Sequence, residues 1–179
     1  MLEIPISKAI TLISPRVTVL VNTLDAQDQV NSSPYSWIYP LSYNPPMVGV
    51  AIGSKQKLTY INAKRTGEFV VCIVPTCIGQ QAFDCAMDHQ PGDKLWEKNG
   101  LQIEPSKQVQ VPRIKQSTAS LECTVSAFLE FGGSHLIMVG KIVQAQAEEG
   151  GLEKIDPLMH ESNANFRAIG KEIILKWKK

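Results

Sequence analysis

Residues 16–23 decide the fold and read RVTVLVNT. The apolar side chains repeat with a period of two, so Val17, Val19 and Val21 share one face of an extended chain, whereas Thr18, Leu20 and Asn22 share the other. A polar, turn-like segment follows at residues 25–29, after which residues 30–37 can return as a partner strand. This pattern predicts an antiparallel pair of strands near the N-terminus.

Patterns typical of strands recur along the rest of the chain. Residues 46–52 and 69–74 are nearly continuous apolar runs, as expected for strands covered on both faces. Further strands are predicted at residues 121–128, 135–147 and 173–177. Helical signals are few: residues 57–64, which the pair Thr66-Gly67 would end, and more weakly residues 78–87. The sequence therefore predicts a mainly β fold with a few short helices, in which short antiparallel strands close into a barrel and leave no long edges.

Length and composition fit one globular domain over residues 1–179. Apolar residues make up 44% and charged residues 20%, and 18 Lys and Arg against 17 Asp and Glu leave a net charge of +1. This balance argues against a surface built for nucleic acid, although it allows a local anion site. The sequence has no apolar run long enough for a membrane span and no visible secretory signal. The four cysteines lack metal-site spacing and are expected to be reduced thiols in a cytoplasmic protein.

Several common kinds of catalytic and binding site are missing from the sequence. It contains no P-loop, no dinucleotide-binding glycine motif, no nucleophile elbow and no zinc-protease helix. Asp84, Asp88 and His89 can be drawn as metal ligands, but no further ligand stands at useful spacing, so a solvated helix end is favoured and no metal site is expected. Residues 88–112 are rich in turns, and a loop of that length is usually functional or covers other residues.

Two neighbouring stretches suggest a site for a phosphate monoester. Residues 31–37 form a strand dense in hydroxyl and amide groups, and residues 53–62 run from a buried strand into a helix. A helix N-terminus offers free N–H groups and partial positive charge, to which Ser54 and Thr59 add hydroxyls and Lys55 and Lys57 add full charges. The alternative is that Ser54 only caps the helix and that the lysines lie in a solvated turn.

Short sequence motifs occur one after another in these two stretches and in later parts of the chain. They read NSSPYS at residues 31–36, P-x-S-Y-x-P-P at 40–46, K-x-T-x-x-N at 57–62, TGEFVV at 66–71, SLEC at 120–123, GSH at 133–135 and VGKIV at 139–143. In this succession the sequence resembles the flavin reductase-like, flavoredoxin-type FMN-binding family from about residue 14 to about residue 170.

The resemblance implies a Greek-key split β-barrel that forms a homodimer with FMN at or near the subunit interface. It implies that the isoalloxazine and ribityl groups run along Asn31, Ser32, Ser33, Pro34, Tyr35 and Ser36, with Trp37 packing nearby. By the same resemblance the phosphate would be held by Ser54, Lys55, Lys57 and Thr59.

Two further positions are carried over from the family, each with a departure from its pattern. His135 stands at the histidine of a Gly-Asp-His motif and would be the catalytic residue near the flavin or the nicotinamide, although Ser134 replaces the aspartate. Near the C-terminus the family often has a histidine or arginine, then paired glycines, then an aromatic residue. His160 and Phe166 match this pattern and by the resemblance would bind the cofactor, while Ser162-Asn163 replace the glycines.

The resemblance implies two alternative functions for this protein, both of which use FMN, and a third function of a different class is also considered. The first is an FMN-dependent oxidoreductase that takes reducing equivalents from NADH or NADPH and passes them to free flavin, a metal ion or an acceptor protein. The second is an FMN-binding electron-transfer protein without its own nicotinamide site. The third is a β-barrel nucleic-acid-binding module, which the net charge of +1 and the scattered aromatic residues disfavour.

Overall fold

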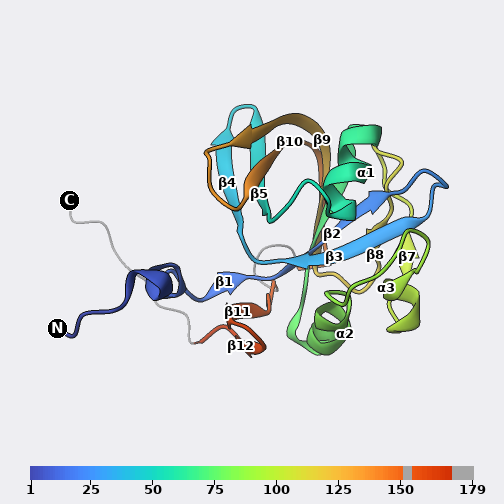
Figure 1. The fold of residues 1–179 in the computed structure, drawn as a ribbon. Helices are drawn as coiled ribbons and strands as arrows, with labels where there is room; N and C mark the ends of the chain where they lie inside the picture. The colour runs from blue at the N-terminus through green and yellow to red at the C-terminus, as the bar shows by residue number, and fades with distance from the viewer. Residues whose placement is uncertain (151–154, 171–179) are drawn as a thin grey trace, which may run out of the picture.

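The computed structural model describes residues 1–150 and 155–170, and it confirms the mainly β fold with few short helices. Its main element is a seven-stranded antiparallel sheet in the order β3-β2-β6-β9-β10-β5-β4 (Figure 1). These strands are β2 (Val19–Leu24), β3 (Val30–Tyr35), β4 (Ile38–Tyr43), β5 (Pro46–Ile52), β6 (Glu68–Ile73), β9 (Ala119–Glu130) and β10 (Leu136–Ala147).

Smaller elements surround the sheet. A three-stranded sheet joins β1 (Arg16–Val17), β11 (Met159–Ser162) and β12 (Asn165–Arg167), and a two-stranded ladder joins β7 (Ile103–Glu104) and β8 (Arg113–Ile114). The helices are η1 (Ile6–Leu12), α1 (Leu58–Thr66), η2 (Thr76–Ile78), α2 (Gly79–Asp84) and α3 (Leu95–Lys98). In the part of the chain that the structure describes, no helix is long and apolar enough to cross a membrane.

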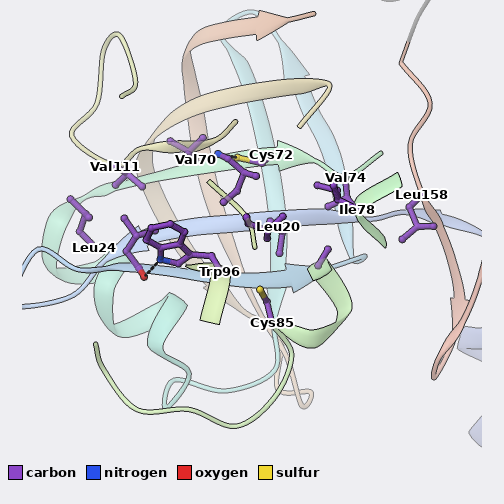
Figure 2. Packing of buried hydrophobic residues seen from close by; sticks show 14 of the residues in the cluster. Leu20, Leu24, Val70, Cys72, Val74, Ile78, Cys85, Trp96, Val111 and Leu158 are labelled. Carbon is purple, nitrogen blue, oxygen red and sulfur yellow. Dashed lines mark hydrogen bonds between the residues drawn. The ribbon is translucent and has the colours of Figure 1, made fainter. Parts of the chain in front are cut away.

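Both faces of β2 are buried, and each face belongs to a different hydrophobic core. Val19 and Val21 pack into one core cluster with Phe69 of β6, whereas Leu20 packs into a second cluster with Trp96 (Figure 2). The period of two in the sequence therefore separates two cores rather than a core and a solvated face.

The predicted strand over residues 16–23 is interrupted at Thr18. The two residues before it pair with β11, with Arg16 opposite His160, whereas β2 pairs with β3 and β6. Thr18 joins the two sheets, since its N–H donates to the carbonyl of Leu158 and its own carbonyl accepts from the N–H of Val74. The strand is therefore interrupted at Thr18 because the chain changes its pairing partner there, from β11 to β3 and β6, and the local sequence gives no indication of this change.

The barrel is split between β3 and β4. These two strands are consecutive in the chain but stand at opposite ends of the strand order, and no ladder joins them. The split β-barrel implied by the resemblance is therefore confirmed, and β3 and β4 are its two edge strands. Figure 1 shows the N-terminal arm with η1 lying away from the curled sheet, on the side of β1, β11 and β12.

The helices and loops correspond to the sequence prediction with different bounds. The predicted helix at residues 57–64 is α1, which Gly67 ends with a left-handed backbone (φ 73°). The prediction over residues 78–87 was too long, because α2 ends at Asp84. The excursion at residues 88–112 covers the second core with Trp96, whose indole N–H donates to the carbonyl of Val30. The strand predicted at residues 173–177 lies outside the described residues.

Candidate functional site

A cavity of about 350 Å³, called cavity A below, brings together the two stretches that the sequence singled out. One wall is the end of β3 with Ser33, Pro34 and Tyr35, and a second is the start of α1 with Lys57, Leu58 and Thr59. The third wall is the segment after α2, residues 85–89. Five of the predicted cofactor-binding residues therefore line one cavity: Ser33, Pro34, Tyr35, Lys57 and Thr59.

The first turn of α1 gives cavity A a group of free donors. Lys57 is the N-cap residue and makes no side-chain capping bond, and the first turn contains no acidic residue. Among the described residues, the N–H groups of Leu58 and Thr59 have no hydrogen-bond acceptor, whereas those of Tyr60 and Ile61 donate to the carbonyl of Lys57. The helix end thus gives the cavity free N–H groups and partial positive charge beside Lys57, which suits an anion, while Asp88 is the acidic residue of the lining.

Tyr35 and Thr59 link the first two walls. Thr59, at the start of α1, is only 1% exposed, and Tyr35 lies at the end of β3. Burial raises the pKa of Tyr35 above its ordinary value, and the neighbouring Thr59 side chain lowers it by less. The phenol is therefore neutral at physiological pH, and both residues line cavity A.

The third wall is fixed by His89, a residue that the sequence analysis placed in a solvated helix end. Its Nε2 lies 2.6 Å from Asn31 Oδ1 of β3, and its Nδ1 lies 2.7 Å from the carbonyl oxygen of Met87. That interpretation was incomplete, because the partner of His89 is 58 residues away in the chain. The only feature of the sequence that pointed to a role for His89 was the unusual length of the turn-rich segment at residues 88–112.

Across residues 1–150 and 155–170, no group of three or more His, Cys, Asp or Glu could hold a metal ion.

Cys85 also belongs to the third wall, and it is a buried, free thiol. Burial raises its pKa to about 11. The group is therefore a neutral thiol at physiological pH, which makes it a packing residue and a weak nucleophile.

A second cavity of about 160 Å³, called cavity B, adjoins cavity A and shares Pro34, Tyr35 and Ala86 with it. It contains three further predicted residues: Ser36, His160 and Phe166. His160 Nδ1 lies 2.8 Å from Ser36 Oγ, and its Nε2 lies 3.1 Å from the carbonyl oxygen of Asn163. The hairpin formed by β11 and β12 thus closes over the end of β3.

The predicted catalytic residue lies beside cavity A and does not line it. The His135 ring stacks on Trp37, with centroids 4.6 Å apart and planes inclined by 24°, and its Nδ1 lies 2.8 Å from Ser134 Oγ. A Cβ atom added to Gly53, which lines cavity A, would lie 3.5 Å from His135 Nε2.

Four other predicted cofactor-binding residues do not line cavity A. Lys55 Nζ is 2.7 Å from Glu130 Oε1, and Ser54 Oγ accepts the N–H of Gln56 rather than capping α1. Neither residue lines cavity A. Asn31 and Ser32 are buried and do not line cavity A, and Ser32 Oγ has no hydrogen-bond partner among the described residues.

Comparisons with known proteins agree on one family and one fold. The family model described as "Flavin reductase like domain" matches residues 13–170. A protein of unassigned function from Archaeoglobus fulgidus is 36% identical over 107 residues, which are 60% of this chain and 59% of that protein. Nitrilotriacetate monooxygenase component B from Bacillus cereus has a similar fold, with a TM-score of 0.88, 24% identity and 98% of each chain covered. Flavoredoxin from Methanosarcina acetivorans gives a TM-score of 0.81 at 25% identity, over 98% of this chain and 95% of the other.

Proposed function

The chain belongs to the flavin reductase-like family, and from this premise we propose that it is a flavoprotein oxidoreductase that holds FMN in cavity A. It would pass reducing equivalents from NADH or NADPH to free flavin, a metal ion or an acceptor protein. The observation that carries the proposal is the meeting of the hydroxyl-rich end of β3 with the uncapped N-terminus of α1 in one cavity.

The residues of cavity A fit such a cofactor. The free N–H groups of Leu58 and Thr59 and the Lys57 ammonium group are suited to a phosphate monoester. Ser33 and the neutral phenol of Tyr35 supply uncharged polar groups along the adjoining wall. When bound, FMN supplies the two-electron chemistry, because its ring accepts a hydride. The chain needs no acid–base pair of its own and has to hold, orient and shield the ring.

A second candidate function is an FMN-binding electron-transfer protein without its own nicotinamide site. It is favoured by the surroundings of His135, whose ring face is covered by Trp37 and whose Nδ1 is turned to Ser134, a residue that stands where the family has an acidic partner. The likeness to a flavoredoxin fits this candidate, and the likeness to a monooxygenase component fits a reductase that serves a partner enzyme.

We propose a homodimer, supported by an apolar groove of about 310 Å³ along Trp37, Ile38 and Tyr39, which Ile10 and Ile13 of the N-terminal arm also line. We propose that residues 1–179 form one domain of this family in the cytoplasm. The cytoplasmic location is supported by four free cysteines.

Anaerobic mixing with a nicotinamide separates the two candidates. The protein loaded with FMN is expected to lose its flavin absorbance when NADH or NADPH is added without oxygen, since hydride transfer bleaches the oxidised ring. Reduction by dithionite serves as the control, because it reports a functional bound flavin without a nicotinamide site. Bleaching by dithionite alone would rule out the oxidoreductase and leave the electron carrier.

A further inference from the structure

His89, in the third wall of cavity A, is held by two hydrogen-bond acceptors. Its Nδ1 lies 2.7 Å from the carbonyl oxygen of Met87, which can only accept, and its Nε2 lies 2.6 Å from Asn31 Oδ1. The nitrogen of the Asn31 amide donates elsewhere, to Ser33 Oγ at 3.3 Å. A neutral imidazole has one N–H group and can serve one of the two acceptors, whereas an imidazolium has two and serves both. The contacts of His89 therefore suit its protonated form.

Loss of a proton from His89 would disturb two walls of cavity A. A neutral ring leaves two acceptors facing each other, either at Met87 or at Asn31. The conflict at Asn31 is relieved when the ring moves away from β3 or when the Asn31 amide turns over, and a turned amide no longer donates to Ser33. Ser33 and His89 both line cavity A, one at the end of β3 and the other in the segment after α2. The arrangement of these two walls is therefore coupled to the proton on His89.

The charged residues around His89 carry no net charge. His89 lines cavity A and a smaller cavity beside residues 89–95. The phenol of Tyr35 and the thiol of Cys85 are neutral at physiological pH, because burial raises both pKa values. Among the described residues, the charged ones that share these two cavities with His89 are Lys57, Asp88, Asp93 and Lys94. Two lysines and two aspartates cancel, so the phosphate of a bound FMN would make the surroundings of His89 negative and favour the imidazolium.

We propose that His89 is a positioning residue of the flavin site and that it makes FMN binding depend on pH, because the protein takes up a proton at His89 when it binds FMN. The inference rests on the proposed function, since the negative charge that favours the imidazolium is the FMN phosphate. Protonation and FMN binding strengthen each other by the same factor. FMN is therefore held more tightly below the titration range of His89, and this advantage is lost as the pH rises through that range.

Calorimetric titration with FMN tests the coupling in the unmodified protein and in His89→Gln. Glutamine is neutral at every pH and keeps one donor for the Asn31 oxygen, and the variant retains the titration of the FMN phosphate and of every other group. Between about pH 6 and about pH 8.5, the ratio of the FMN affinity of the unmodified protein to that of the variant is expected to fall about five- to tenfold. Titrations at about pH 7.5 in two buffers with different ionisation enthalpies count protons, and the unmodified protein is expected to take up a fraction of a proton more per FMN.

Asn31→Asp is a variant of opposite effect. Its carboxylate accepts the same hydrogen bond from Nε2 and adds a charge that favours the imidazolium, so the loss of FMN affinity is expected to begin at a higher pH than in the unmodified protein. A loss that begins at the same pH would contradict the assignment to His89.

Thermal unfolding shows whether each variant is folded. A constant affinity ratio with equal proton uptake, in two folded proteins that both bind FMN, would overturn the role of His89 and leave the proposed function standing. Absence of FMN binding in the unmodified protein would overturn the proposed function and the role of His89 with it.

Discussion

Replacing Lys57 by methionine is expected to weaken FMN binding about ten- to hundredfold and to leave riboflavin binding nearly unchanged. Lys57 is the N-cap residue of α1 and lines cavity A beside the free N–H groups of Leu58 and Thr59. A charge-assisted contact to phosphate contributes about 1.5–3 kcal/mol, and riboflavin has no phosphate to make it. Fluorescence titration with both ligands measures the two affinities.

Lys55→Met is the matched control for this experiment. Lys55 stands only two residues away, but its ammonium group pairs with Glu130 and does not line cavity A. Its replacement removes the same charge from the same turn and is expected to change FMN affinity by less than about threefold, the size of a screened surface effect. Equal losses in the two variants, or equal losses of FMN and riboflavin in Lys57→Met, would remove the phosphate from the start of α1.

Glu122→Ala is expected to lower the free energy of unfolding by about 3 kcal/mol or more. The Glu122 side chain is fully buried in β9 and accepts the backbone N–H groups of Lys107, Gln108 and Val109 at 2.9, 2.6 and 3.3 Å. Its removal leaves three donors in the loop without an acceptor, and Val109 of that loop packs on the second core. Urea unfolding measures the change.

Glu68→Ala provides the comparison, because Glu68 accepts only the N–H of Gln110 from the same loop, at 2.8 Å. Its removal is expected to cost about 1 kcal/mol. Glu122→Gln keeps one acceptor oxygen and is expected to fall between the two alanine variants. A Glu122→Ala variant no less stable than Glu68→Ala would show that the loop does not depend on this carboxylate.

The strands were the part of the fold that the sequence predicted best. The run at residues 69–74 corresponds to β6, whose side chains pack into both cores, and the run at residues 46–52 corresponds to β5, which packs into the core of Val19 and Val21. The alternation at residues 121–128 correctly indicated β9 but gave no sign that Glu122 is buried. The buried carboxylate is paired with the loop N–H groups of residues 107–109, which lie 13 to 15 residues away in the chain.

The site was predicted in part, and the reason lies in the range of the contacts. The start of α1 and the end of β3 each have a local signal, and the structure places both in cavity A. The third wall depends on the contact between His89 and Asn31, and the break at Thr18 depends on β11, so no local pattern reveals either. Lys55 and Lys57 are the same residue type two positions apart. Only the folded structure shows that Lys55 pairs with Glu130 whereas Lys57 lines cavity A.

If cavity A holds a flavin by its phosphate, titration of the unmodified protein with FMN and riboflavin under identical conditions will distinguish the two ligands. Tighter binding of FMN by about tenfold or more is expected, because only FMN can use Lys57 and the free N–H groups of α1. Equal affinity for the two flavins, or no uptake of FMN at all, would show that cavity A does not hold FMN by its phosphate.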